Sequence, residues 1–197
     1  MSKSILLSLL SLLIITFCAC KKSKTERTKV YVPAYLKAMA PYTNGQSLSF
    51  RNGSGQVVNA TVSITSTFSS SQVCGGCPDV PNPEQLTYSL NAGANKFIVF
   101  EMSPESYISL SVYSPLDNFQ SRGGFSYSID VGLVHGSCFA QGQTCLSSVT
   151  LNGKTFTDVV EITASFSGSS SPVIAYHTVS QGIVAFKYAN GTTYTLD

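Results

Sequence analysis

The sequence predicts an all-β protein, folded as an antiparallel barrel or sandwich of about nine to eleven short strands. Three observations support this prediction. Apolar residues alternate with polar ones in several short stretches, which is the pattern of strands with one buried face. Asn-Gly pairs, which favour tight hairpin turns, fall between such stretches. Beyond residue 45, no segment keeps apolar residues at helical spacing for three turns.

The chain begins with the features of an export signal. Residues 5–17 read ILLSLLSLLIITF, and Lys3 places a positive charge in front of them. This run is too short for a helix that crosses a bilayer, which needs about 20 residues, but it has the length of a signal-peptide core. Ala19 is the kind of small residue that precedes a cleavage site. We therefore expect a signal peptide over residues 1–19 and Cys20 at the start of the mature chain.

The expected cleavage site resembles the lipobox of bacterial lipoproteins. Its residues are Phe17-Cys18-Ala19-Cys20, and Phe17 departs from the usual leucine, valine or isoleucine. In that family the cysteine thiol receives a diacylglycerol and the new amino terminus is acylated, for example with palmitate, so the resemblance implies a lipid anchor on Cys20. Two or three acyl chains hold a protein firmly, because each buried methylene contributes about 0.8 kcal/mol. The alternative is an ordinary secretory signal followed by a soluble protein.

Basic residues are concentrated directly after Cys20. Residues 20–29 contain five basic residues and one acidic residue, whereas residues 30–197 contain six basic and nine acidic residues. A short basic segment beside an acyl anchor is typical of a tether that lies near anionic headgroups. We expect no nucleic-acid partner, because the protein is exported and its body is acidic. Residues 20–29 are thus predicted to be a lipidated tether, and residues 30–197 a single all-β domain.

Strand alternation is clearest in three stretches of the body. These are residues 57–68 (VVNATVSITSTF), 106–113 (SYISLSVY) and 124–132 (GFSYSIDVG). Asn-Gly pairs at residues 52–53, 152–153 and 190–191 link further strand-like segments and predict type I′ hairpins, in which both central residues have positive φ. Residues 32–41 (VPAYLKAMAP) predict a short irregular or helical lead-in.

Three patches of this strand and turn pattern resemble small lipoproteins of Bacteroidota-type Gram-negative bacteria. They are PYTNGQSLSFRNGSGQVVNATVSI, VTLNGKTFTDVVEI and GIVAFKYANGTTYTLD. The resemblance implies a cell-envelope address and an all-β fold without implying any chemistry. Surface-exported members usually carry acidic residues just after the cysteine, and KKSKTE departs from that pattern. The resemblance therefore implies an outer-membrane anchor with the domain facing the periplasm.

Four cysteines remain in the body, at Cys74, Cys77, Cys138 and Cys145. Disulfides suit an oxidising envelope compartment best. A four-cysteine zinc site or free thiols are the second interpretation, although the second pair lacks CxxC spacing. A redox CxxC is the third, but three prolines follow CGGC where a thiolate-stabilising helix would begin. We favour Cys74–Cys77 and Cys138–Cys145, and crossed pairing stays open.

The most suggestive ligand surface is an aromatic and hydroxyl-bearing strand face. Tyr107, Ser109, Ser111 and Tyr113 share the polar side of residues 106–113. Tyrosine combines an apolar ring with a hydroxyl, so this face could line a barrel mouth or a carbohydrate-binding groove. An ordinary exposed sheet face, where aromatic residues are common, is the alternative.

The histidines offer weaker candidates for a site. Asp130, His135 and Ser137 lack a nucleophile elbow, and three residues so close along a strand do not converge as a catalytic triad. His177 alternates in phase with apolar residues, which predicts a packed or rim histidine.

The carboxylates select no catalytic pair or metal site. Glu101 and Glu105 are expected to flank a turn, and Asp158 and Glu161 to fall on opposite faces of one strand. Asp79, Asn82 and Glu84 offer oxygen ligands for calcium without EF-hand spacing, so this stretch predicts a proline-stiffened loop.

Together these features predict a lipid-anchored cell-envelope protein that serves as a non-catalytic binding or interaction module. We expect no cofactor and no metal. One alternative is a β-barrel carrier for a small apolar or aromatic ligand. A second is an envelope hydrolase that uses carboxylates from distant strands.

Overall fold

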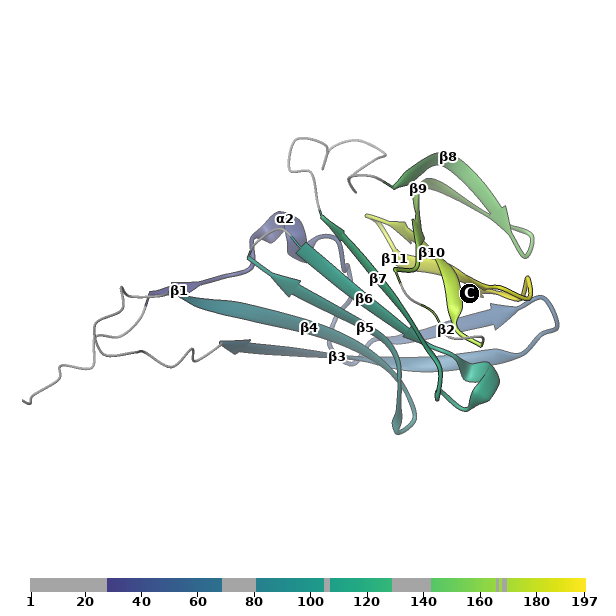
Figure 1. Cartoon of the computed structure of the whole chain (residues 1–197), viewed down its shortest axis with the longest axis horizontal. Coiled ribbons are helices and arrows are strands. Elements are labelled where there is room, and N and C mark those ends of the chain that lie inside the picture. Colours follow the sequence, from purple (N-terminus) through teal and green to yellow (C-terminus); the bar gives the residue numbers. More distant parts are fainter. Residues whose placement is uncertain (1–27, 69–80, 105–106, 129–142, 166, 168–169) are drawn as a thin grey trace, which may run out of the picture.

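The computed structural model describes residues 28–68, 81–104, 107–128, 143–165, 167 and 170–197 (Figure 1). Eleven antiparallel strands form one strongly curled sheet, a half-barrel, which confirms the predicted all-β class. The strand order is β7-β6-β5-β4-β3-β2-β12-β11-β10-β9-β8. Two meanders, β2 to β7 and β8 to β12, are therefore joined where the last strand pairs with β2.

The strands are mostly short, as predicted. In chain order they are β2 (Ser47–Asn52), β3 (Val57–Phe68), β4 (Asn82–Ala92), β5 (Asn95–Ser103), β6 (Tyr107–Tyr113), β7 (Arg122–Ser128), β8 (Thr144–Leu151), β9 (Lys154–Thr163), β10 (Pro172–Thr178), β11 (Gly182–Tyr188) and β12 (Thr193–Leu196). The two-residue strand β1 (Lys29–Val30) pairs in parallel with the start of β4. A one-turn helix, α2 (Ala34–Lys37), and the 3₁₀ turn η1 (Pro115–Asp117) complete the described elements.

The alternation predicted for β3 and β6 is confirmed by burial. In β3, Val58, Ala60 and Val62 are buried. Their neighbours Asn59 and Thr61 are exposed. The same alternation holds in β6, where the buried residues are Ile108, Leu110 and Val112. One face of the sheet thus supplies the core, and the other, which we call the outer face, carries polar side chains.

The type I′ prediction is correct for one of the three Asn-Gly pairs. Asn152 (φ 48°) and Gly153 (φ 81°) both have positive φ, as this turn requires. At residues 190–191 only the glycine has positive φ, and at residues 52–53 neither residue does. The prediction fails there because the asparagine side chain stabilises a different turn. Asn52 Oδ1, for example, accepts hydrogen bonds from the backbone N–H groups of Ser54 and Gln56, at 3.2 and 2.9 Å.

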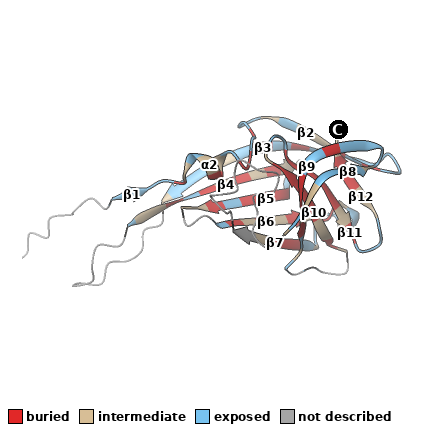
Figure 2. Cartoon of the chain, turned by 90° about the horizontal axis from the view of Figure 1, so that it is seen from above, coloured by how far each residue is buried: buried red, intermediate tan, exposed pale blue. Residues whose placement is uncertain are grey.

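Aromatic rings fill the inside of the half-barrel. Phe50 of β2, Phe97 of β5 and Phe186 of β11 are fully buried, and their ring centroids lie 5.2 to 5.6 Å apart. Tyr194 of β12 stacks on Phe186 at 5.5 Å. Strands far apart in the sheet order therefore meet through their side chains, and Figure 2 shows buried residues along the strands that curl around this core.

The predicted lead-in crosses this interior. It contains α2, in agreement with the expected helical piece, and it buries Leu36 and Met39 in the core together with Tyr42, which directly follows the predicted segment; from here on the lead-in includes Tyr42. The Tyr42 hydroxyl accepts a hydrogen bond from the backbone N–H of Ile183 at 2.8 Å. Gly182 (φ 75°) permits this packing, because a Cβ there would lie 2.2 Å from the Tyr42 oxygen. The lead-in thus connects the two meanders across the open side of the sheet.

The β8–β9 hairpin forms a smaller second layer. Phe156 and Val159 of β9 pack with Tyr176, Val184 and Ala185 of β10 and β11 in a separate cluster. At the hairpin tip, the side chain of Asn152 donates a hydrogen bond to the Thr193 carbonyl at 2.8 Å. Asp158 has a φ of 53°, which interrupts the regular alternation along β9.

Candidate functional site

The outer face of β4 to β7 carries a groove that includes most of the predicted ligand face. Two hollows of about 240 and 200 Å³ adjoin there, and both are lined by Glu101, Tyr107 and Ser109. The first extends to Pro83, Gln85 and Ser103, and the second to Ser111, Arg122, Ser126 and Ser165. We call this combined surface the groove.

Strand register determines which side chains meet in the groove. Glu101 of β5 lies opposite Ser109 of β6, and Ser109 lies opposite Ser126 of β7. Tyr107 lies opposite Ser103. Directly opposed residues of an antiparallel pair have Cβ atoms about 5 Å apart, so these side chains are neighbours on one surface.

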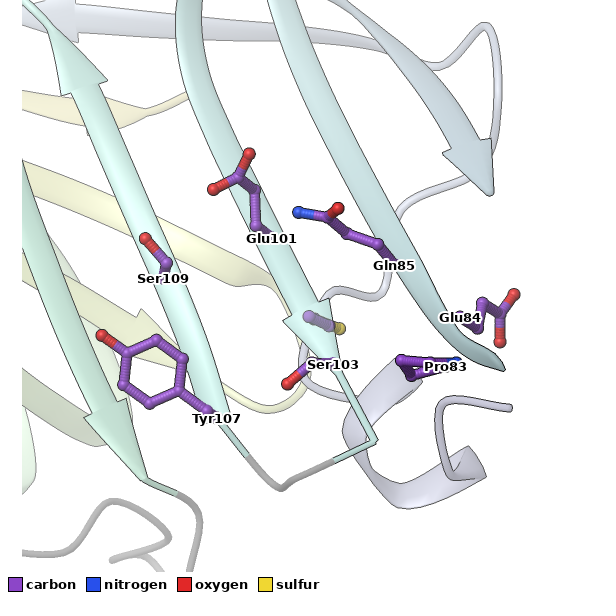
Figure 3. Close-up of a pocket in the computed structure, with 8 residues that line it drawn as sticks. Pro83, Glu84, Gln85, Glu101, Ser103, Tyr107 and Ser109 are labelled. Atoms are coloured by element: carbon purple, nitrogen blue, oxygen red, sulfur yellow. The ribbon is translucent and has the colours of Figure 1, made fainter. Parts of the chain in front are cut away.

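Figure 3 shows how the groove residues are directed. The Gln85 amide extends from β4 towards the Glu101 side chain on β5. Ser109 and Tyr107 lie beside them on β6. The Tyr107 side chain is 44% exposed, which is high for an aromatic residue in a sheet. The groove thus presents the exposed ring of Tyr107, the carboxylate of Glu101, the guanidinium of Arg122, and several hydroxyl and amide groups.

Glu84 borders the groove, but its carboxylate points away from Glu101 (Figure 3). It accepts hydrogen bonds from the Val32 N–H at 2.8 Å and the Ser66 hydroxyl at 2.7 Å, and it pairs with Lys37 at 3.4 Å. Burial by itself would raise the pKa of Glu84, but these three partners lower it overall. Glu84 therefore attaches the lead-in to β3 and β4 and forms no carboxylate pair with Glu101.

The prediction for Glu101 was wrong in its placement. It lies inside β5 and not beside a turn, while Glu105 falls outside the described residues. Ile98, Phe100 and Met102 form the buried face of β5, so Glu101 projects to the outer face between them. The alternation of this segment indicated an outward-facing Glu101, but the sequence alone did not indicate that β4 and β6 would pair with β5, or that β7 would follow β6 in the sheet. Gln85 and Arg122 were missed for the same reason.

Tyr113 was predicted to share the ligand face and does lie on the same strand. It is partly buried and is not among the residues that line the two hollows, in contrast to Tyr107, Ser109 and Ser111. The groove therefore occupies most of the predicted face and leaves out its far end at Tyr113.

The cysteine predictions fall mostly outside the described residues. Cys20, Cys74, Cys77 and Cys138 lie there, and Cys145 in β8 is disulfide-bonded. The bond agrees with the disulfide interpretation for Cys145, and the pairing stays a prediction. Asp130, His135 and Ser137 also lie outside the described residues.

His177 is a packed residue, as predicted. It is fully buried, and its Nε2 lies 2.6 Å from the Met39 carbonyl oxygen, so Nε2 carries the proton. Burial lowers the pKa of His177 to about 4, although the hydrogen bond to Met39 acts in the opposite direction. The side chain joins the lead-in to β10.

The calcium hypothesis has no support among the described residues. Asp79 lies outside them, and the Glu84 carboxylate is already bound by three donors. Asn82 and Glu84 belong to β4, so the expected loop is a strand at these positions. The described part of the chain contains no cluster of three potential metal-ligating His, Cys, Asp or Glu residues.

Another hollow, of about 370 Å³, lies between the β8–β9 hairpin and the β10–β11 connection. Its charged residues are Lys154 and Asp197, which pair with each other at 3.8 Å. Asp197 also accepts two hydrogen bonds from Arg51, both at 3.1 Å, and the Arg51 hydrogen bonds are the main cause of its lowered pKa. These charges hold the chain end and the hairpin together, which makes this hollow a weaker ligand candidate than the groove.

No protein-family model, curated protein or solved structure matches this chain. Within the described ranges, no helix is long and apolar enough to cross a membrane.

Proposed function

We propose that the protein is a lipid-anchored cell-envelope module, held at the outer membrane through Cys20, that faces the periplasm and binds a saccharide in the groove without catalysis. The observation that supports binding is the groove itself, with the exposed ring of Tyr107 beside Glu101, Gln85 and Ser109. The anchor is supported by the signal-like run and by Ala19-Cys20.

The chemistry of the groove suits a hydroxyl-rich ligand. A sugar ring has an apolar C–H face that packs on an aromatic ring, and hydroxyls around its rim that exchange hydrogen bonds with carboxylate, amide and hydroxyl groups. Tyr107 offers the first kind of contact, and Glu101, Gln85 and Ser109 offer the second. The two hollows adjoin across four strands, β4 to β7, which favours an extended ligand of more than one sugar ring.

Neither alternative function receives comparable support. A carrier needs an interior cavity, and the inside of this half-barrel is packed with aromatic side chains. A hydrolase with two carboxylates needs both in one cleft, and Glu84 points away from Glu101.

Saccharide binding can be tested by titrating the purified protein with an oligosaccharide panel prepared from the envelope of the source bacterium, using calorimetry. Tyr107→Ala should weaken binding at least tenfold, which corresponds to about 1.4 kcal/mol. Tyr113→Ala is the matched control, because Tyr113 lies on the same strand and face but does not line the groove. Absence of binding to every member of the panel, or equal losses in the two variants, would contradict the proposal.

The anchor is tested separately by Cys20→Ala and cell fractionation. The wild-type protein should sediment with outer membranes, and the variant should lose that association. Mass spectrometry of the native protein should find two or three acyl chains at the amino-terminal cysteine. An unmodified Cys20 in the native protein would exclude the anchor without affecting the groove.

A further inference from the structure

One end of the molecule exposes a small aromatic and basic surface that the groove does not use. Tyr31 is 58% exposed, and its ring meets the Phe68 ring edge to face at 5.4 Å. The Lys29 ammonium lies 5.0 Å from the centre of the Phe68 ring. Val30, which lies between Lys29 and Tyr31 in the sequence, is 36% exposed. We call Lys29, Val30, Tyr31 and Phe68 the aromatic end.

This surface has the composition of a membrane interface. Tyrosine and phenylalanine rings sit favourably at the level of lipid headgroups, and lysine is attracted to anionic lipids. In the core of a soluble domain such rings would be covered, yet Tyr31 is among the most exposed of the large apolar residues described. The exposed ring of Tyr31 and the partly buried ring of Phe68, next to the Lys29 cation, point to a partner that is both apolar and anionic.

The position of the aromatic end in the chain identifies that partner. The described structure begins at Thr28, directly before β1, and β1 lies at one extremity of the molecule (Figure 1). Thr28 lies eight positions after Cys20. Even fully extended, eight residues reach about 28 Å, so an anchor on Cys20 holds the aromatic end close to the bilayer. Four further basic residues lie in this short segment, at Lys21, Lys22, Lys24 and Arg27.

We propose that the aromatic end lies against the anionic phospholipid surface and fixes how the domain stands on the membrane. This proposal rests on the lipid anchor proposed above. Anchor and aromatic end act together, since the anchor raises the local concentration of headgroups around a surface that alone binds weakly.

Docking in this way places the groove near the membrane. Pro83 lines the groove and pairs with Val30 of β1, and Tyr107 lies at the end of β6 that is nearest to this pair. The opposite end of β6 leads to η1, where Leu116 is 40% exposed. The groove then faces saccharides that are themselves attached to the membrane surface.

The absence of tryptophan from the sequence allows a direct test. The full chain is purified from membranes and reconstituted in vesicles of phosphatidylethanolamine and phosphatidylglycerol with brominated acyl chains, which quench nearby indoles. Tyr31→Trp places one reporter at the aromatic end. Leu116→Trp places a matched reporter, also at an exposed apolar position, at the opposite end. Flotation of the vesicles measures the anchor independently.

We expect both variants to float with the vesicles and only the Tyr31→Trp protein to be quenched, at least twofold relative to unbrominated lipid. Lys29→Glu in the Tyr31→Trp background should reduce that quenching. Flotation without quenching of either reporter would overturn the docking and leave the anchor intact. Equal quenching of both reporters would also overturn it, since the domain would then have no preferred orientation. Failure to float would overturn the anchor and the docking together.

Discussion

The wild-type protein should lose stability between pH 7 and pH 5, and replacing His177 with glutamine should abolish most of that loss. His177 is fully buried and neutral, and burial lowers its pKa from the ordinary 6.5 to about 4. Below pH 6.5 the unfolded chain binds a proton at this histidine that the folded protein does not bind. Falling pH therefore favours the unfolded state, down to the folded pKa near 4.

The size of the effect follows from these two pKa values. Between pH 7 and pH 5 the free energy of unfolding should fall by about 2 kcal/mol, and by about 3 kcal/mol once the pH is below 4. The carboxylates act in a different window. Glu84 has a lowered pKa, so its contribution is present above its ordinary value of 4.5 and is lost only below it. The interval from pH 7 to pH 5 thus isolates the histidine.

Urea unfolding followed by circular dichroism, with the disulfides kept oxidised, measures this loss. With a typical slope of about 2 kcal/mol per molar urea, the wild-type midpoint should fall by about 1 M between pH 7 and pH 5. The His177→Gln protein starts less stable, because packing is lost, but its midpoint should change by less than about 0.3 M. Glutamine retains an N–H that can donate to the Met39 carbonyl.

His135→Gln is the matched control, since it removes the other histidine of the chain. Its midpoint should fall with pH as the wild-type midpoint does. A pH response that persists in His177→Gln and disappears in His135→Gln would refute the assignment of the pH dependence to His177. A wild-type protein that is equally stable at both pH values would refute the argument that burial lowers the pKa of His177.

Three further substitutions test the contacts that hold the sheet and its lead-in together, each measured by urea unfolding at pH 7. Gly182→Ala should destabilise the protein by at least about 2 kcal/mol, because alanine disfavours the positive φ of this position and its methyl group would overlap the Tyr42 ring. Wild-type stability would show that Tyr42 packs elsewhere. Glu84→Gln should cost about 2 kcal/mol, because Val32, Ser66 and Lys37 lose the charged acceptor that they share. An unchanged midpoint would contradict this network. Asn152→Ala should cost about 2 kcal/mol, since asparagine tolerates the positive φ of this position and its side chain donates to the Thr193 carbonyl. Its control Asn190→Ala should cost less than about 1 kcal/mol, because φ is not positive there. A larger loss in Asn190→Ala than in Asn152→Ala would contradict the turn assignment.

Local patterns predicted the strands well because alternation is a property of each strand alone. Val58 and Val62 of β3 face the core because their neighbours are polar, whichever strand lies beside them. The pairing of β12 with β2 had no such signal. It joins residues more than 140 positions apart, such as Thr195 and Arg51, and depends on the whole curl of the sheet. The choice between barrel and sandwich could not be made from the sequence for the same reason.

The candidate site was half predictable. Tyr107, Ser109 and Ser111 were found because they alternate on one strand, and alternation assigns them to one face. Gln85 and Arg122 come from β4 and β7, and only the strand order brings them to the same surface. A groove that spans several strands is a property of register, which single-strand patterns do not contain.

The location of the groove on the outer face follows from how the half-barrel is filled. A sheet that curls without closing leaves its inner surface open to water, and this protein covers that surface with its own lead-in. The hydrogen bonds of Tyr42 and His177 hold the lead-in in place. If the lead-in moved away, the Ile183 N–H and the His177 ring would lose their buried hydrogen-bond partners. A ligand that entered the interior would have to displace these contacts, which favours the outer face for the binding that we propose. There the polar side chains of β4 to β7 are solvated, and Tyr107 is exposed among them.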